Sequence, residues 1–356
     1  MSSLSFYKKQ FDHVYYTSDV KELSSFKEVC QKLDHLEFQE VVSKEAIPPE
    51  HRNQRTLLLT ASRGQVLDHC PGSKGHLCCN YHTLDLYIGC TLGCSYCIMR
   101  SYLNFSPVIV NMNIEEILQE VRCFIEARQQ EGKTIRIGTG EVGDSLLYDP
   151  LFGFSQRLYE LCANYENVYF EAKSKTDFVD HLLDIPEKGN GVIGFSMNPP
   201  SIGASEEGTA APVEKRIEAA LRAQKAGFLI ALHFDPIFYY AKWEQEYGDL
   251  IQSLSVLDPK AMAWISMGTF RYTLGLKENI ANRWYLWDEF VPGKDQKFRY
   301  IQKKRREMYR FIRKNLEKHF LNAKIYMCME SPAMWEGVFG KKPRKIPELC
   351  AIFKAI

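Results

Sequence analysis

Short apolar stretches alternate with amphipathic ones along most of the chain, and this alternation limits the fold more than any other feature. Strands are expected at 84–88, 134–137, 168–171, 191–196, 228–233 and 261–266. Helices are expected between them, where apolar residues recur at helical spacing, at 113–128, 151–163, 177–183, 212–226 and 243–254. This rhythm predicts an α/β fold with a parallel sheet and right-handed crossovers. Six such strands are fewer than a closed eight-stranded barrel requires.

The chain has 356 residues, which is enough for one large α/β core. Its formal net charge of +1 gives no global attraction to nucleic acid, so any nucleic-acid surface has to be local. The N-terminus lacks an apolar signal core, and no run of about 18 apolar residues suggests a membrane span. We therefore expect a cytoplasmic monomer without membrane contact, whose 11 cysteines stay reduced.

Three cysteines, Cys90, Cys94 and Cys97, form a CxxxCxxC loop with Tyr96 directly before the third. Thiolates on one loop can hold a four-iron cluster, and three of them leave one iron open for chemistry. Zinc is the alternative. However, zinc sites favour paired CxxC units or added histidines, and no CxxC partner follows at finger spacing. The spacing therefore favours an iron-sulfur cluster.

Polar residues and glycines follow three of the later strands. They are Gly138, Gly140 and Glu141, then Lys175, then Ser196 and Asn198. Each alone is typical of an ordinary turn or a solvated side chain. Active sites of barrels gather where the strands end, so their common position favours one binding site. Glycines allow close approach of a ligand, a carboxylate can accept hydrogen bonds from an ammonium group, and a lysine can neutralise a carboxylate.

The cysteine spacing with its aromatic residue resembles the signature of the radical S-adenosylmethionine (SAM) superfamily, and the GxGE sequence at 138–141 looks like that superfamily's glycine-rich motif. The resemblance implies a partial (β/α)6 barrel of the TIM type at 84–270, with an N-terminal extension at 1–83 packing on it and a helical, basic C-terminal extension at 271–356. It also implies that SAM chelates the open iron. One electron from the cluster then cleaves SAM to a 5′-deoxyadenosyl radical.

A closer resemblance, to the spore photoproduct lyase family, runs from about residue 84 to 323. It is carried by residues 179–184, 195–198, 214–220 and 225–228. Those enzymes are radical SAM lyases that repair DNA by reverting a methylene-bridged thymine dimer. The resemblance implies SAM contacts at Tyr96, Lys175, Ser196 and Asn198, DNA as a partner, and a flavodoxin- or ferredoxin-type reductant.

The chain departs from that family at two positions of the radical-quenching relay. It has Glu141 where the family places its hydrogen-donor cysteine, and Ile98 where the family places a tyrosine after the third cluster cysteine. A carboxylate and an isoleucine cannot replace a weak S–H bond. We therefore expect intact radical initiation and altered termination. Cys79 and Cys328 are the candidate relocated donors.

The segment before the first expected barrel strand contains Cys70, His76, Cys78 and Cys79. These residues are candidates for a second metal site, although adjacent cysteines suit one tetrahedral ion poorly. A glycine-rich lid over the barrel mouth and a loop of reduced thiols are the alternatives.

Two basic runs lie near the C-terminus, at 299–314 and 340–345. Clustered basic residues can follow phosphates and interleaved aromatics can stack on bases, but the first run also suits an amphipathic helix packed on the barrel. Arg271, after the last expected strand, is a candidate for binding a substrate phosphate. Two alternative functions stay open from the residues alone. One is radical SAM chemistry on a substrate other than DNA, and the other is metal binding without catalysis.

Overall fold

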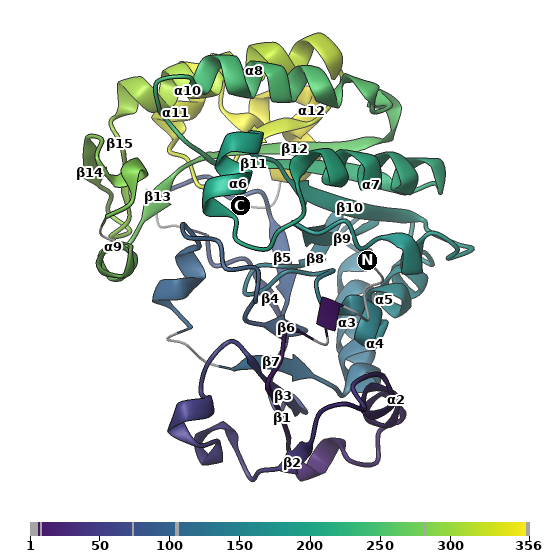
Figure 1. The fold of residues 1–356 in the computed structure, drawn as a ribbon. Coiled ribbons are helices and arrows are strands. Elements are labelled where there is room, and N and C mark those ends of the chain that lie inside the picture. Colours follow the sequence, from purple (N-terminus) through teal and green to yellow (C-terminus); the bar gives the residue numbers. More distant parts are fainter. Residues whose placement is uncertain (1–5, 8, 73–74, 104–106, 281, 354–356) are drawn as a thin grey trace. The chain divides into compact units, whose positions relative to one another are not determined.

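Strands and helices alternate through most of the chain, as the periodicity predicts (Figure 1). The computed structural model describes residues 6–353 except 8, 73–74, 104–106 and 281. They form two units, which are described separately. The first comprises residues 1–69, 82–93 and 102–191, and the second comprises 70–81, 94–101 and 192–356.

The first unit contains two groups of strands. One is a five-stranded sheet in the order β2-β1-β3-β7-β6, and the other is the run β9-β8-β5-β4. The strands are β1 (His13–Tyr16), β2 (Phe38–Glu40), β3 (Thr56–Thr60), β4 (Leu67–His69), β5 (Tyr81–Leu84), β6 (Tyr87–Ile88), β7 (Val108–Asn111), β8 (Ile135–Thr139) and β9 (Val168–Ser174). The helices are α2 (Ser24–Lys32), α3 (Ile114–Gln129), α4 (Asp149–Phe152) and α5 (Phe154–Cys162).

The second unit contains the parallel run β16-β12-β11-β10 and a small antiparallel sheet, β13-β15-β14. Its strands are β10 (Asn190–Ser196), β11 (Leu229–Ile237), β12 (Met262–Thr269), β13 (Arg271–Tyr272), β14 (Phe290–Pro292), β15 (Phe298–Tyr300) and β16 (Ile325–Met327). Its helices are α6 (Pro200–Glu206), α7 (Val213–Lys225), α8 (Trp243–Ser253), α9 (Leu274–Asn279), α10 (Gln302–His319), α11 (Pro332–Phe339) and α12 (Pro347–Phe353). Helices α8 and α10 lie side by side (Figure 1).

Short 3₁₀ helices connect these elements, at Ser18–Val20, Lys44–Ala46, Pro49–His51, Ile98–Ser101, Asp180–Leu182, Leu254–Val256, Pro259–Ala261, Trp284–Leu286 and Pro343–Lys345. The central strands form the core. Every residue of β8 and β12 is buried, as expected for parallel strands covered on both faces.

The strand expected at 84–88 is wrong as a single element. The strand β5 ends at Leu84, and β6 pairs antiparallel with β7 in the five-stranded sheet. The side chain of Asn111 causes the break, because its amide donates to the Asp85 carbonyl at 2.7 Å while its backbone N–H donates to Leu86. The chain therefore changes sheets just before the cysteine loop.

Two of the expected helices are also corrected. The helix expected at 151–163 is divided into α4 and α5 by Gly153, which has φ +70°, a left-handed conformation that ends a helix. The helix expected at 177–183 is only the short turn Asp180–Leu182. Within the described residues, no helix is both long and apolar enough to cross a membrane. The domain boundaries after 83 and 270 stay a prediction.

Candidate functional site

Two glycines fix the path of the chain into the cysteine loop. Gly89 has φ +94° and donates its N–H to Val142 at 2.9 Å, and it forms an isolated bridge with Gly143. A Cβ on Gly143 would lie 2.6 Å from the carbonyl oxygen of Tyr87, which is too close for any side chain. The loop after β8 therefore supports the approach to Cys90 through backbone contact that only glycine allows.

The first part of the cysteine loop is held by hydrogen bonds to its backbone. The Thr91 N–H donates to the Tyr148 hydroxyl at 2.9 Å, and the Leu92 N–H donates to Cys90 Sγ at 3.4 Å. Gly93 has φ +76°, which turns the loop sharply. Cys90 itself is half-buried. A backbone N–H directed at sulfur suits a thiolate ligand.

The second part of the loop belongs to the second unit. Cys94 is buried and Cys97 is half-buried, and the Cys97 N–H donates to the Cys94 carbonyl at 3.3 Å. The residues between these cysteines, Ser95 and Tyr96, donate their hydroxyl hydrogens to Glu206 and Glu207. Neither carboxylate could be recognised from the sequence, because their partners lie more than 100 positions away.

The donor set fits an iron-sulfur cluster. Three reduced cysteines stand within eight residues on a loop bent by Gly93, with Cys94 shielded from water. Thiolates are the ligands that such clusters take, and shielding lowers competition from solvent. Within the described residues no three His, Cys, Asp or Glu side chains, these cysteines included, are grouped to hold a metal ion, so the fit rests on the type, spacing and shielding of the three thiols.

The glycine-rich turn after β8 packs closely on the end of β9. Gly140 has φ +90°, and a Cβ there would lie 2.7 Å from Ser145 Oγ and 2.9 Å from the Lys173 carbonyl oxygen. Gly138 lies within β8 and pairs with Glu171 in β9. Glycine at position 140 is therefore required for this turn to reach the neighbouring strand.

A buried carboxylate, Asp144, fixes the backbone at Lys175. Its side chain accepts hydrogen bonds from the N–H of Lys175 at 2.7 Å, the Ser174 hydroxyl at 2.7 Å and the Leu147 N–H at 3.0 Å. Burial raises the pKa of the Asp144 carboxyl, whereas these hydrogen bonds lower it. Asp144 was not predicted from the sequence, although it orients the segment that carries Lys175.

The carboxylate of Glu141 acts electrostatically on that of Asp85. Burial, followed by the charges of Glu141 and Asp68, raises the pKa of the Asp85 carboxyl from 3.8 to about 6. Neighbouring carboxylates of this kind favour a cation beside them. The charge pattern therefore suits a ligand ammonium group near Glu141.

Asn198 and Tyr96, both expected near SAM, are hydrogen-bonded to each other at 3.2 Å. The Asn198 amide also donates to Glu207 Oε1 at 3.0 Å and accepts from the Tyr247 hydroxyl at 3.0 Å. The carbonyl of Ser196, at the end of β10, accepts from Arg216 at 2.8 Å. The side chain of Asn198 is thus bound within the protein, which favours an orienting role for it.

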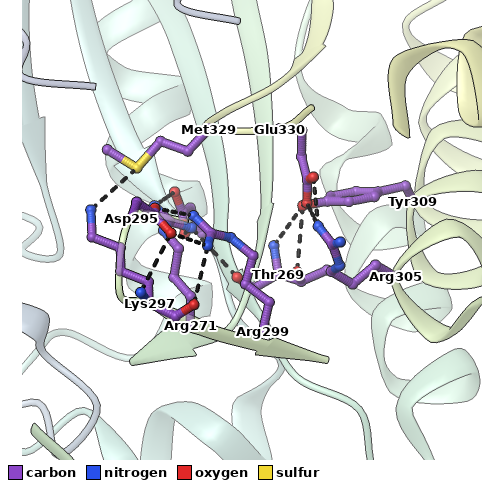
Figure 2. Close-up of polar contacts among 10 residues, drawn as sticks. Thr269, Arg271, Asp295, Lys297, Arg299, Arg305, Tyr309, Met329 and Glu330 are labelled. Carbon is purple, nitrogen blue, oxygen red and sulfur yellow. Dashed lines mark hydrogen bonds and ion pairs between the residues drawn. The ribbon is translucent and has the colours of Figure 1, made fainter. Parts of the chain in front are cut away.

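Arg271, the candidate phosphate ligand, forms a two-point ion pair with Asp235 at 3.0 and 3.1 Å. Figure 2 shows it beside Lys297, whose Nζ lies 4.0 Å from Met329 Sδ. Burial lowers the pKa of the Lys297 ammonium group, and the positive charge of Arg271 lowers it further. Cys328 is close enough to interact electrostatically with both cations. Lys297 was not predicted from the sequence.

A second pairing joins the two segments that carry the candidate hydrogen donors. The Leu77 N–H donates to the Glu330 carbonyl at 3.0 Å in an isolated antiparallel bridge. The Glu330 carboxylate is buried and accepts from Arg305 at 2.6 and 2.7 Å and from Tyr309 at 2.9 Å (Figure 2). Leu77 and Glu330, each two residues from a candidate donor cysteine, therefore lie next to each other.

The other cysteines of the 70–81 segment contact one another. The thiol of Cys78 hydrogen-bonds with those of Cys70 and Cys79, and the bond to Cys70 is the largest cause of its raised pKa. The Cys70 N–H donates to Tyr81 at 2.9 Å and closes the segment. Ser73 and Lys74, which belong to the glycine-rich lid considered from the sequence, lie outside the described residues.

The basic run at 299–314 forms the end of β15 and most of α10. Its apolar face is buried through Met308, Tyr309 and Ile312, as the amphipathic alternative predicts. Lys304, which is half-buried in the first turn of α10, pairs with Asp288. Contact with nucleic acid along this helix stays a prediction.

Comparison with known proteins identifies relatives for most of the chain. A family model described as spore photoproduct lyase matches residues 51–328. The spore photoproduct lyase of Bacillus subtilis (strain 168) is 24% identical over 234 residues, which are 65% of this chain. That of Clostridium acetobutylicum is 26% identical over 177 residues, or 49% of this chain. The chain spans 66% and 52% of the lengths of these two proteins.

Solved structures of spore photoproduct lyase have the same fold. A mutant with bound AdoMet and dinucleoside spore photoproduct gives a TM-score of 0.77 at 20% identity, covering 90% of this chain and 99% of that one. A complex with dinucleoside spore photoproduct gives 0.76 at 21% identity, with the same coverage. This likeness confirms the predicted α/β partial barrel. Two strands were not expected from the sequence: β4 pairs with β5 in the first unit, and β16 pairs with β12 in the second.

Proposed function

The chain belongs to the spore photoproduct lyase family, and on this premise we propose that it is a radical SAM enzyme acting on a damaged pyrimidine in DNA. The CxxxCxxC loop carries the proposal, because its three reduced thiols and its glycine-bent backbone suit a cluster with one open iron. The family's solved structures bound to AdoMet and to dinucleoside spore photoproduct support the choice of cofactor and substrate.

Cys90, Cys94 and Cys97 would hold the 4Fe-4S cluster, which supplies the electron that cleaves SAM to a 5′-deoxyadenosyl radical. Gly138 and Gly140 let the turn after β8 approach SAM, and Glu141 accepts from its ammonium group. Lys175, on a backbone fixed by Asp144, neutralises its carboxylate. The roles of these residues rest on family resemblance and on the local charge.

Ser196, Asn198 and Tyr96 complete the proposed SAM side of the site. The hydrogen bonds of Asn198 to Tyr96 and Tyr247 keep its amide in one orientation. In this proposal Asn198 holds the cysteine loop, through Tyr96, beside the end of β10. The Ser196 hydroxyl contacts SAM.

The resemblance aligns Glu141 with the family's donor cysteine and Ile98 with its tyrosine, and on this alignment we propose a relocated hydrogen donor. Cys79 and Cys328 are the candidates, and the Leu77 to Glu330 bridge places their segments next to each other. Cys328 also follows β16 directly, with its N–H bound to Met267 at 2.8 Å. Arg271 and Lys297 lie near it and are candidates for holding a substrate phosphate.

A cytoplasmic monomer that receives electrons from a flavodoxin- or ferredoxin-type protein completes the proposal. The decisive experiment is anaerobic reconstitution with iron and sulfide, followed by assays of SAM cleavage with and without ultraviolet-damaged DNA. We expect an absorbance at about 400 nm, which is typical of thiolate-bound iron-sulfur clusters. We also expect the reduced protein to cleave SAM. Zinc uptake without SAM cleavage would refute the proposal. Cleavage without any DNA binding would instead favour a substrate other than DNA.

The cysteine variants test the cluster directly. Replacing Cys90, Cys94 or Cys97 with Ala should reduce bound iron from roughly four atoms to almost none. Cys123, which is exposed on α3, provides the matched control, and Cys123→Ala should keep the iron content of the unaltered chain.

A further inference from the structure

Two consecutive carboxylates at the end of α6 hold the middle of the cysteine loop. Glu206 is the last residue of α6 and Glu207 follows it, and they are 3% and 1% exposed. A buried carboxylate is costly unless its oxygens accept hydrogen bonds or face a cation. Both carboxylates have such partners, and one partner of each lies between Cys94 and Cys97.

Glu206 fixes Ser95. Its carboxylate accepts from the Ser95 hydroxyl, from the Trp284 indole at 2.8 Å and from Arg283 at 3.4 Å. Its backbone carbonyl accepts from the Ser95 N–H at 2.8 Å, and the Tyr285 hydroxyl donates to Ser95 Oγ at 3.0 Å. Both the backbone and the side chain of Ser95 are therefore held.

Glu207 fixes Tyr96. One carboxylate oxygen accepts from the Tyr96 hydroxyl and from Asn198 at 3.0 Å, and the other accepts from Arg216. Arg216 is 1% exposed and also donates to the Ser196 carbonyl at 2.8 Å. The charge of Glu207 is thus neutralised inside the protein while its other oxygen holds the loop.

These tethers bear on the cluster ligands. Ser95 and Tyr96 are the only residues between Cys94 and Cys97, and the Glu207 carbonyl lies 3.9 Å from Cys94 Sγ. Groups that hydrogen-bond around metal ligands set their orientation and tune the reduction potential of the cluster.

We propose that Glu206 and Glu207 are positioning residues for the iron-sulfur cluster, which by holding Ser95 and Tyr96 set where the thiolates of Cys94 and Cys97 stand. The inference rests on the proposed function, since it requires the cluster. It assigns the pair to no chemical step, because the two carboxylates act through the loop.

Two conservative variants remove the tethers one at a time. Ser95→Ala removes the hydroxyl held by Glu206, and Tyr96→Phe removes the hydroxyl held by Glu207 while Arg216 still neutralises that carboxylate. The matched control is Glu218→Gln on α7, whose carboxylate is about half exposed and pairs with Lys215 at 2.7 Å. Each protein is reconstituted as the full chain.

The first readout is the rate at which a chelator removes iron, the second is the electron paramagnetic resonance spectrum of the reduced cluster, and the third is the melting temperature of the metal-free chain. We expect both loop variants to lose iron roughly tenfold faster, the lower end of the effect of groups around metal ligands. We also expect their spectra to change, while the melting temperature stays near that of the unaltered chain. The control should match the unaltered chain throughout.

Unaltered iron loss and spectra in both variants would overturn the inference and leave the proposed function standing. A lowered melting temperature with an unchanged spectrum would also overturn it, because the tethers would then support the fold alone. If the unaltered chain takes up no iron, both the proposed function and the inference are refuted.

Discussion

Asp85 is a half-buried carboxyl group within electrostatic reach of Glu141, a residue of the proposed SAM site. It shares its surroundings with Glu141 and Asp68, and its pKa rises from 3.8 to about 6. Because the folded chain binds this proton more tightly than the unfolded chain, the free energy of unfolding falls as pH rises from about 4 to about 6. Above about pH 6, Asp85 is ionised in the folded and the unfolded chain, and its burial lowers the free energy of unfolding by the full amount.

Asp85→Asn should therefore stabilise the protein at pH 7.5 and have little effect near pH 4. The expected gain is about 1–2 kcal/mol, which is less than the full shift implies because Asp85 is partly exposed. Urea unfolding at the two pH values measures it. A gain of equal size at both would mean that charge is not the cause.

Glu141 and Lys175 should each contribute to SAM affinity if they hold its ammonium and carboxylate groups. Glu141→Ala and Lys175→Ala should each weaken binding by roughly 1.5–3 kcal/mol, the scale of a charge-assisted hydrogen bond. Calorimetry on the reconstituted protein measures this. Glu131→Ala and Lys133→Ala serve as controls, since these residues form an exposed pair before β8. Unchanged affinity in both site variants would show that the strand-end residues do not bind SAM.

At the scale of elements, the sequence predicted repeating helices and strands well and predicted bends poorly. The helix α3 begins directly after Asn113 as expected, because its apolar spacing is long and regular. The break after Leu84 was missed, since the apolar alternation continues across it and only the hydrogen bonds of Asn111, 26 residues away, reveal it. Glycine at position 153 is typical of a helix end, but the apolar residues on both sides of it continue the helical spacing, so one long helix was predicted.

The contact between the turn after β8 and the approach to the cysteine loop predicts a sensitive position. Gly143→Ala should destabilise the protein by roughly 1–3 kcal/mol, because the new Cβ meets backbone atoms of Tyr87 and Gly89, which cannot move cheaply. Chemical unfolding measures the loss. Gly64→Ala is the control, since a Cβ there meets nothing within 4 Å, and it should change stability by less than about 0.5 kcal/mol. Equal effects from both substitutions would refute this account of Gly143.

At the scale of the whole molecule, the candidate cluster ligands could be predicted from the sequence, but the groups that hold their loop could not. Cys90, Cys94 and Cys97 are recognisable because their spacing is local. Asp144 and Glu207 are not, because each is an ordinary acidic residue until the fold supplies its partners. Asp144 meets the segment after β9, and Glu207 meets a loop 111 positions earlier. Only the tertiary structure shows that these carboxylates are buried and accept hydrogen bonds from distant residues.

The end of the radical reaction depends on a group that returns a hydrogen atom to the substrate. If Glu141 and Ile98 stand in place of the family's quenching pair, as the resemblance implies, a thymine radical has no thiol at the usual position. The bridge between Leu77 and Glu330 instead joins the segments of Cys79 and Cys328. We therefore expect the reduced enzyme to cleave SAM readily but to convert dinucleotide spore photoproduct to thymines slowly.

That residual conversion should depend on the two relocated thiols. Replacing both Cys79 and Cys328 with Ala should lower it by at least about tenfold, equivalent to about 1.4 kcal/mol in the barrier, while SAM cleavage persists. Chromatography of the products measures both reactions in the same sample, and Cys123→Ala controls for loss of an unrelated thiol. If multiple-turnover repair survives the double replacement, neither cysteine is the donor, and the hydrogen atom must come from a group outside both segments.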